Sequence, residues 1–391
     1  MGVFFTYSGM TGKYDGPDIW SDGDSTIDEL ESKFHTPAIR IIYGLPLGRF
    51  KVGTEVQIAY RNERQEFKET YSSSAVINET YYLYNLFTMH PYDSSYWEAL
   101  LKGSLEGKVG LLDASFTIRG GYIFAGDNTL LYESQMPVGV PDSWYKLDGD
   151  VEGWRVGSEL WLRLPFSSTL SLPFLLRADY QTKTRDGSGP GMGGIDYRDF
   201  TYEHKRKDLT ITIGSGVDKS LSANSRFAVG LYYNYHRTKD YFSEGGVGAG
   251  WFVDDKIIPD MSEHQLLLKV ATEHTLSSAV ILRGGISLFY GYLDIKAEDQ
   301  WASGGLFYGN YEGSGNGYRA GIGASLGASI SLKQVILEPF IKGGYQQFRV
   351  KWDGEEYHNI HAPYRLEVLD KEKHMRSQWY IGAGLSVLFG Q

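Results

Sequence analysis

Residues 376–391, at the end of the chain, alternate between two kinds of side chain. Every second position from Trp379 to Phe389 is apolar, whereas the positions between them are mostly small or polar. A period of two is that of a β-strand whose two faces meet different environments. The apolar face continues over about six positions, roughly the length of a tilted strand that crosses a bilayer. The pattern recurs along the chain and predicts a transmembrane β-barrel.

The composition fits such a barrel and excludes several other classes of protein. No run of eighteen uncharged apolar residues predicts a transmembrane helix. A barrel escapes that test because half of each strand is polar. The absence of cysteine excludes disulfides, Cys-ligated zinc and covalently attached c-type haem, and the net charge of −10 argues against a nucleic-acid partner. Because no signal peptide is visible before the first strand-like residues, we expect an exported chain to have lost it.

We expect about fourteen antiparallel strands in an up-and-down order, joined alternately by tight turns and long polar loops. The tight turns are expected at residues 47–49, 106–110, 167–168, 220–224, 277–278 and 332–333. The long loops are expected at about residues 15–35, 70–94, 126–152, 184–204, 240–262, 296–316 and 353–375. Short periplasmic turns and long extracellular loops are typical of bacterial outer-membrane barrels. An even number of strands then places both termini on the periplasmic side.

An aromatic residue stands at the long-loop end of most of the apolar faces. Such residues form a girdle at a membrane interface, since the ring favours lipid and its polar edge favours water. The preference of tyrosine for strands does not by itself explain why the aromatic residues gather at one end. The expected girdle consists of Tyr60, Tyr122, Trp154, Tyr180, Tyr235, Tyr292, Tyr318, Tyr345 and Trp379.

The chain resembles a Gram-negative outer-membrane β-barrel over essentially its full length, as a single domain spanning residues 1–391. Its ending from Gly384 to Phe389 is similar to the C-terminal assembly signal of that class, although Gly390 and Gln391 follow the final aromatic residue. The strand number resembles the monomeric fourteen-stranded channels and the FadL-like hydrocarbon transporters. The FadL-like group carries an N-terminal plug before its first strand, whereas strand-like sequence begins here almost at once. The resemblance implies a bacterial outer-membrane location, with lipid and lipopolysaccharide as neighbours. Because the outward residues of no strand stand apart as a subunit interface would, we expect a monomer.

The inward faces are the candidate functional site, because outward residues serve only to meet the lipid. Alternation places both cations and acids there, with several charged pairs within one strand, such as Glu98 with Lys102 and Arg177 with Asp179. The predicted pore-lining residues are Arg40, Glu55, Arg61, Glu98, Lys102, Asp113, Arg119, Arg155, Glu159, Arg163, Arg177, Asp179, Lys269, Glu273, Arg283, Arg319, Glu338 and Lys342. A mixed lining predicts weak ion selectivity with a slight preference for anions.

The first functional interpretation is a porin-like channel for small hydrophilic solutes or ions. One alternative is a gated transporter of apolar or amphipathic molecules, with an inner pocket formed by Leu175, Phe289, Phe340 and Phe348. Another is a closed barrel whose inner face is filled by ion pairs and whose loops bind a surface partner.

Two segments outside the expected strands carry further hypotheses. Residues 244–253 are rich in glycine and include Trp251 and Phe252, so they either form a gate at the barrel mouth or pack against other loops. The gate residues would be Glu244, Val247, Trp251 and Phe252. The basic residues 204–207 either contact lipopolysaccharide phosphates or form a solvated, salt-bridged extension of a strand.

We do not expect an enzyme, a cofactor or a metal site. Of the nine histidines, His236 is expected to face the lumen and His204 to lie near Asp196 and Asp199, and neither lies in a Ser–His or Asp–His pattern that resembles the outer-membrane proteases or phospholipase. His358 and His361 lack an evident third ligand, and the glycines at 321, 323 and 327 lie in a strand rather than at a strand–helix turn.

Overall fold

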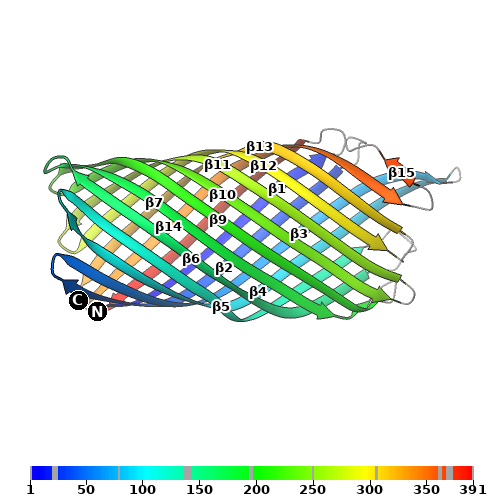
Figure 1. Ribbon diagram of the computed structural model, residues 1–391, viewed down its shortest axis with the longest axis horizontal. Helices are drawn as coiled ribbons and strands as arrows, with labels where there is room; N and C mark the ends of the chain where they lie inside the picture. The colour runs from blue at the N-terminus through cyan, green and yellow to red at the C-terminus, as the bar shows by residue number, and fades with distance from the viewer. Residues whose placement is uncertain are drawn as a thin grey trace.

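The computed structural model describes residues 2–19, 25–77, 80–135, 143–192, 197–248, 251–303, 307–359, 363–366 and 373–389. Over these residues the chain forms a closed antiparallel barrel, seen in Figure 1 as a long tube. Fourteen long strands build its wall, as the sequence predicts, and β8 and β15 are short additions of two and four residues. The strands are β1 (Gly2–Ile19), β2 (Ser25–Leu47), β3 (Phe50–Ile77), β4 (Thr80–Val109), β5 (Leu112–Gln135), β6 (Ser143–Pro165), β7 (Leu170–Gly189), β8 (Gly191–Met192), β9 (Tyr197–Ser222), β10 (Ser225–Gly248), β11 (Trp251–Ser277), β12 (Val280–Ser303), β13 (Phe307–Leu332), β14 (Val335–Asn359), β15 (Pro363–Leu366) and β16 (Lys373–Phe389).

The barrel closes through its first and last strands. β1 pairs with β2 on one side and with β16 on the other, in a register that places Phe5 opposite Val387. β16 in turn pairs with β14. Every long strand of the described wall therefore has two neighbours and leaves no open edge, which is the condition for a sheet to cross a bilayer.

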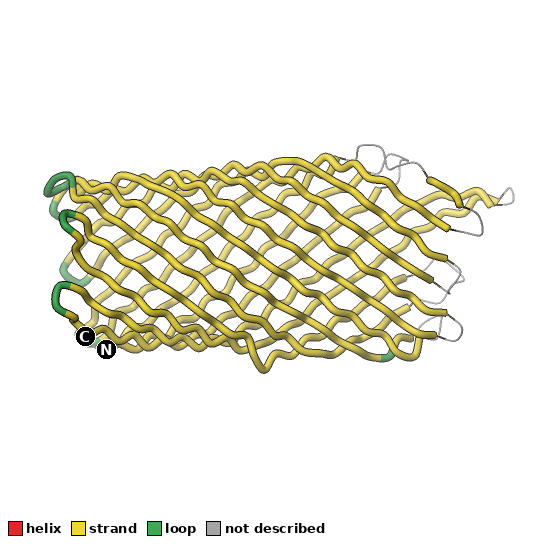
Figure 2. Tube along the Cα trace, viewed as in Figure 1, coloured by secondary structure: helices red, strands yellow, loops and turns green. Residues whose placement is uncertain are grey.

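The short turns and both termini lie at the same end of the tube, on the left in Figures 1 and 2. All six predicted tight turns lie between consecutive long strands. Gly48 and Gly110 hold φ angles of 61° and 63° in two of these turns, a left-handed conformation that glycine adopts without a steric cost. By the usual layout of such barrels, this is the periplasmic end.

The opposite end differs from the sequence prediction, because most of the expected long loops are continuations of the strands. β3 and β4, for example, continue to Ile77 and from Thr80, well inside the segment expected as a loop. The long strands have 17 to 30 residues, more than the nine to eleven or so that span a bilayer, so the tube projects into water. A hydrogen-bonded ladder continues in water as well as in lipid, and polar residues mark the water rather than the end of a strand.

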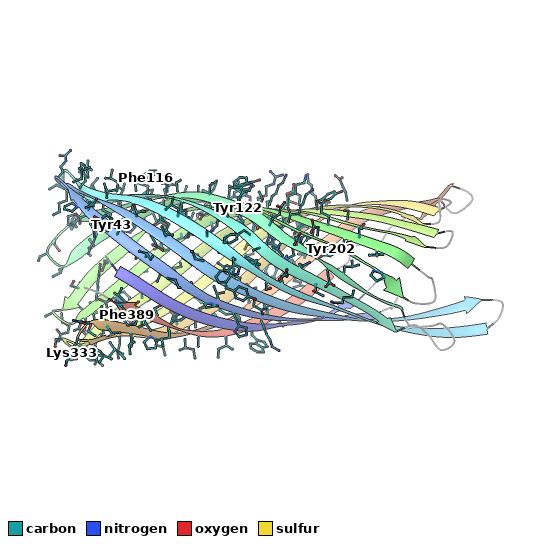
Figure 3. The ribbon with its side chains drawn as sticks, turned by 90° about the horizontal axis from the view of Figure 1, so that it is seen from below. Tyr43, Phe116, Tyr122, Tyr202, Lys333 and Phe389 are labelled. Carbon is teal, nitrogen blue, oxygen red and sulfur yellow. The ribbon has the colours of Figure 1, made fainter. Side chains whose placement is uncertain are left out.

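The outer surface of the tube carries the predicted apolar faces. Leu101, Ile118, Leu231 and Ile286 are each more than half exposed on it. In Figure 3 such side chains stand outward along the tube from the end near Lys333. A band of this size is stable in contact with lipid rather than water. Among the described residues there is no helix with the length and apolarity to cross a membrane.

The predicted aromatic girdle is present, and its rings touch across neighbouring strands. On β5 the outward stretch from Ala114 to Tyr122 has the length expected of one tilted crossing. Trp97 and Tyr290 join the predicted members. The ring centroids lie 5.3 Å apart for Tyr60 and Trp97, 5.4 Å apart for Trp154 and Tyr180, and 5.9 Å apart for Tyr290 and Tyr318.

Candidate functional site

Most of the predicted pore-lining residues surround two cavities of the lumen or pair with the residues that do. Lys102, Arg119, Arg155, Arg177, Asp179, Lys269 and Arg319 line a central cavity, and Glu273, Arg283 and Glu338 line a second one near the periplasmic end. Ion pairs with other residues of the inner wall hold Arg40, Glu55, Arg61, Glu98, Glu159 and Arg163. Asp113 lies 3.9 Å from Lys108 beside a periplasmic turn, and Lys342 lines neither cavity.

Ion pairs tie strands of the inner wall together. The carboxylate of Glu98 on β4 lies 2.8 Å from a guanidinium nitrogen of Arg61 on β3 and 2.8 Å from one of Arg155 on β6. The pair with Arg155 passes over the intervening β5 at Gly121, where a Cβ atom would lie 3.2 Å from Arg155 Nε. Glu98 is thus almost buried between two cations that come from opposite sides of it.

The pairs expected within one strand are mostly replaced by pairs between strands. Arg177 and Asp179 do pair on β7, at 2.5 Å. Lys102, expected beside Glu98, instead lies 2.9 Å from Glu55 on β3. The cause is geometric, since Glu98 and Lys102 are four residues, or about 13 Å, apart on one strand, whereas Lys102 is directly opposite Glu55 at about 5 Å.

An inward glycine opens a path for the best-formed pair. Arg119 on β5 donates two hydrogen bonds of 2.7 Å to the carboxylate of Asp179 on β7. Gly157 on β6 stands between them in register. A Cβ atom at this position would collide with the Asp179 carboxylate and lie 2.8 Å from Arg119 Nε. Only a residue without a side chain allows these two groups to meet across β6.

The same arrangement recurs across β12, with a residue that the sequence interpretation missed. Glu263 on β11 accepts a hydrogen bond of 3.1 Å from Arg319 Nε on β13, above Gly291. Glu263 was overlooked because the expected loop extended to residue 262 and cut its strand short. Glu263 lies an even number of residues from Lys269 on the same strand, so alternation from Lys269 would have placed it on the inward face. Asp218 and Arg226, which flank the tight turn at residues 220–224, were also missed, although they too line the lumen.

Aromatic rings lie beside the ion pairs on the other half of the lumen. Phe289 on β12 is opposite Gly321 in register, and a Cβ atom on that glycine would lie 2.6 Å from the ring. Tyr380 on β16 lies in the same way against Gly344 on β14, with a corresponding distance of 2.7 Å. The rings therefore lie along the wall, over glycines, rather than pointing across the lumen. Tyr232 on β10 covers Gly214 similarly.

The lumen therefore has two unlike halves. We call β2–β7 the charged half, because twelve of the eighteen predicted charged residues come from it. We call β10–β16 the aromatic half, because alternation turns Tyr232, Phe289, Phe340, Phe348 and Tyr380 inward there. The described inward aromatic residues of the charged half are Tyr96 and Trp161. β1 and β9 separate the two halves on the ring of strands.

The central cavity measures about 770 Å³ and takes its lining from both halves. Two of the acids in this part of the wall lie deeper than their partners. The side chain of Glu263 is 1% exposed against 30% for Arg319, and that of Glu98, behind the lining, is 5% exposed against 29% for Arg155. Asp179, by contrast, is more exposed than Arg119. The charged groups that line the cavity are mainly cationic, and Leu100, Leu175, Leu267 and Tyr232 supply apolar surface beside them.

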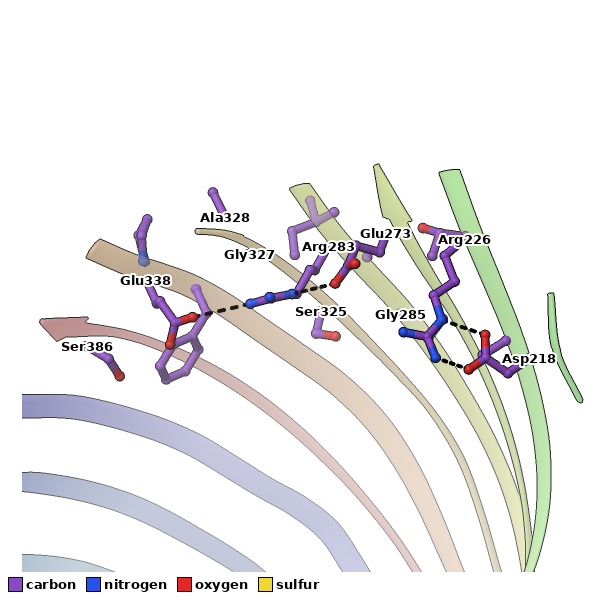
Figure 4. A pocket seen from close by; sticks show the side chains of 17 residues that line it. Asp218, Arg226, Glu273, Arg283, Gly285, Ser325, Gly327, Ala328, Glu338 and Ser386 are labelled. Carbon is purple, nitrogen blue, oxygen red and sulfur yellow. Dashed lines mark hydrogen bonds and ion pairs between the residues drawn. The ribbon is translucent and has the colours of Figure 1, made fainter. Parts of the chain in front are cut away.

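The periplasmic-end cavity, of about 590 Å³, is closer to electrical balance. Figure 4 shows its two groups of paired side chains. Arg226 donates a hydrogen bond of 2.6 Å from Nε to Asp218, and Arg283 bridges Glu273 and Glu338 at 3.0 Å and 3.3 Å. Arg163 reaches the same Asp218 at 3.3 Å.

Above the girdle the inward side chains of the charged half are closely packed. Tyr96, Ile123 and Val151 form a buried cluster from β4, β5 and β6. Lys183 on β7 donates a hydrogen bond of 3.0 Å to the hydroxyl of Tyr96, three strands away on the ring. The cluster lies beside a bulge of β5 at which Ala125 has a φ of 47°. It narrows this side of the lumen above the central cavity.

Two inward histidines contact acids. His204 Nε2 lies 3.1 Å from Asp240. His236 Nε2 faces both Thr238 Oγ1, at 3.2 Å, and Asp208, at 3.6 Å. Both histidines therefore belong to the polar network on the inner face of β9 and β10.

The residues of the expected apolar pocket and of the expected gate occupy different parts of the barrel. Leu175 lines the central cavity and Phe340 the periplasmic-end cavity, so these two of the four expected pocket residues lie at different depths. The gate segment forms the end of the β10–β11 hairpin, with Val247 opposite Phe252. The side chains of Glu244, Val247, Trp251 and Phe252 lie outside the described residues, and the gate stays a prediction.

No family model and no curated protein sequence matches the chain. Solved structures similar to it include the toluene transporter TodX of Pseudomonas putida, at 11% identity and a TM-score of 0.46, over 99% of this chain and 89% of that one. A FadL homologue of Pseudomonas aeruginosa and the toluene transporter TbuX of Ralstonia pickettii each show 10% identity and a TM-score of 0.43, over 100% of this chain and 89% of theirs. Similarities at this level decide neither the family nor the cargo.

The barrel's own surfaces establish its class. A closed, up-and-down barrel of fourteen long strands with an exposed apolar band and an aromatic girdle is built to cross a bilayer. The chain is a Gram-negative outer-membrane β-barrel, as the sequence predicts.

Proposed function

We propose that the barrel is a channel through which small amphipathic molecules cross the outer membrane. The observation that carries the proposal is the division of the lumen into a charged half and an aromatic half. A solute with a polar group and an apolar group finds both kinds of surface in the central cavity, where Leu100, Leu175, Leu267 and Tyr232 lie beside the charged side chains, and the rings of the aromatic half extend the apolar surface along the lumen. A purely ionic or purely apolar solute matches only one kind of surface.

The charges of the lumen favour a solute with little net charge of its own. Carboxylates of the wall already hold the guanidinium groups of Arg119, Arg155 and Arg319. A group that is hydrogen-bonded in this way attracts ions less than an unpaired one, but it can still donate a hydrogen bond to a neutral polar group.

The apolar contacts come from side chains that the wall keeps in place. The ring of Phe289 lies over Gly321, and those of Tyr232 and Tyr380 lie over Gly214 and Gly344. Rings held flat against the wall offer a face to a passing solute and lose little conformational freedom when it binds.

A second candidate is a channel for small hydrophilic anions. The observation in its favour is the charge of the central cavity, which is lined by the six cations Lys102, Arg119, Arg155, Arg177, Lys269 and Arg319 and the two acids Asp179 and Glu263. A cationic lining of this kind favours the passage of anions.

Single-channel current in planar bilayers separates the candidates. We would add glucose or n-hexyl glucoside, which share a neutral polar group and differ in one alkyl chain. Amphipathic passage predicts that hexyl glucoside interrupts the current at concentrations at which glucose does not. The interruptions should be lost in a Phe289→Ser, Tyr232→Ser variant and kept in the outward control Tyr290→Ser.

The other outcomes point elsewhere. Equal effects of the two sugars, with a reversal potential that shows anion selectivity, would replace the first candidate by the second. A folded barrel without any conductance would contradict both and favour a closed barrel that binds a surface partner.

A further inference from the structure

The basic residues 204–207 are divided by the strand between the two faces of the wall. His204 and Arg206 face inward, where His204 lies 3.1 Å from Asp240 and Arg206 lies 3.1 Å from Asp208. Lys205 and Lys207 alternate with them and face outward, and both are exposed. The basic sequence is therefore an internal network on one face and a cationic outer surface on the other.

On the outer surface Lys207 of β9 is directly opposite Lys239 of β10. Both are exposed, and among the described residues neither has a carboxylate within ion-pair distance. Directly opposed side chains of two strands have Cβ atoms about 5 Å apart, and two like charges at that distance destabilise the pair. An anion bound between the two lysines would therefore relieve their repulsion.

The neighbouring acids do not supply that anion, because other cations hold them. Glu203 lies 2.7 Å from Lys205. Asp260, which is opposite Lys239 on β11, accepts hydrogen bonds of 3.0 Å and 2.7 Å from Arg237 instead. Asp260 still feels the charge of Lys239, but among the described residues no carboxylate lies within ion-pair distance of Lys207 or Lys239, and the outer face of β9 and β10 keeps the two positive charges side by side.

The position of this pair matches the headgroup layer of the membrane. Lys239 lies four residues beyond the girdle residue Tyr235 on the same outward face. Four residues extend about 13 Å along a strand, or roughly 10 Å in height for a strand tilted by about 40°. Charged lipid headgroups lie next to the aromatic belt at that height.

The outer rim is not cationic everywhere. On β6 the exposed outward residues beyond the girdle residue Trp154 are Glu152, Asp150 and Asp148. The exposed Lys146 on the same strand lies 3.0 Å from Asp148. The cationic outer surface of β9 and β10 is therefore not shared by β6.

We propose that Lys207 and Lys239 form a binding site for a phosphate group of an outer-leaflet lipid, the chemistry that lipopolysaccharide presents at this height. A phosphate between the two ammonium groups accepts charge-assisted hydrogen bonds from both and removes their repulsion. Arg237 and Lys205, beside the pair, add to the positive potential without being free themselves. The site lies on the lipid-facing wall and is independent of what passes through the lumen.

The test measures the binding of lipopolysaccharide to the purified barrel in detergent, with the same lipid stripped of its phosphates as a second probe. The Lys207→Gln, Lys239→Gln variant is expected to lose on the order of tenfold or more in affinity for the intact lipid, since each lysine near an anionic surface contributes appreciably. The Lys207→Arg, Lys239→Arg variant should keep most of it.

The control variant Lys108→Gln, Lys146→Gln removes the same number of charges from positions that already have an acid nearby. It should bind as the unmodified protein does. Equal binding by the Lys207→Gln, Lys239→Gln variant, or equal binding of the phosphate-free lipid, would overturn the proposal. Complete displacement of the lipid by inorganic phosphate at a similar concentration would also overturn it, in favour of a site for the free ion.

Discussion

The charged half and the aromatic half of the lumen use inward glycines for the same purpose and with opposite results. On the charged half Gly157 leaves room for Arg119 and Asp179 to meet over β6. On the aromatic half Gly321 leaves room for the ring of Phe289 to lie flat. The first glycine thereby admits a strand-to-strand ion pair and the second admits apolar surface, although Gly291 on the aromatic half also admits a pair, that of Arg319 with Glu263. The comparison teaches that a small residue in the wall takes its role from the side chain opposite it in register.

Filling the space at Gly157 is expected to have the largest effect on the fold. Gly157→Val forces the Asp179 carboxylate away from Arg119, so that Asp179 keeps only Arg177 and Arg119 keeps only the more distant Glu159. Breaking a part-buried pair and overpacking the wall together should cost about 4 kcal/mol. Guanidinium unfolding of the barrel in lipid vesicles measures this cost.

The matched control is Gly103→Val on the outer face, where an added Cβ atom meets nothing closer than Ile118 at 3.7 Å. The control should fold with a nearly unchanged midpoint. Equal stability of the two variants would show that the crossing over β6 contributes nothing.

Removing one carboxylate without adding bulk should have the next largest effect. Glu98→Gln leaves Arg61 and Arg155 without the negative charge that both contact at 2.8 Å. We expect a loss of about 3 kcal/mol, because the side chain is 5% exposed and its partners are left partly buried. Glu159→Gln is the control, since Glu159 is 32% exposed and lies 3.9 Å from Arg119. If the two variants unfold at the same denaturant concentration, burial does not govern the strength of these pairs.

The outward half of this architecture follows from the sequence, whereas the inward half needs the register. Lipid imposes one uniform requirement on residues such as Leu101 and Ile118, so alternation alone identifies them. The partner of an inward residue depends on the register in which neighbouring strands pair. Gly157 lies far in the sequence from both Arg119 and Asp179. The residues next to Gly157 in the sequence therefore do not predict that this ion pair forms across it. Glu263 was missed for a different reason, because polar sequence beyond the membrane was interpreted as a loop rather than as strand.

On the aromatic half, Phe289→Ala is expected to act on transport more than on stability. The ring is partly exposed to the lumen, so its removal should cost about 1–2 kcal/mol, less than the loss of a buried pair. It also uncovers Gly321 and removes a face on which an apolar group binds. The expected result is a smaller effect of hexyl glucoside on the current with little change in ion conductance. Phe289→Leu should restore the stability but only part of the blocking, and full blocking by the alanine variant would show that the ring does not contact the solute.

The smallest expected effect on stability is that of Asp208, on the strand β9 between the two halves, and it depends on pH. Asp208 on β9 lies beyond the girdle, three residues past the partner of Tyr235. Burial raises the pKa of Asp208, but the hydrogen bond with His236 and the charge of Arg206 outweigh it and lower the pKa to about 2. A carboxyl group whose pKa is lower in the folded state stabilises the fold above its ordinary pKa, near 3.8, and loses that contribution as the pH falls towards 2. The unfolding midpoints of the protein and of Asp208→Asn should therefore differ at pH 6 and converge between about pH 4 and pH 2. A difference that stays constant over this range would mean that the charge of Asp208 plays no part, and that its hydrogen bond from Thr238 alone accounts for its contribution.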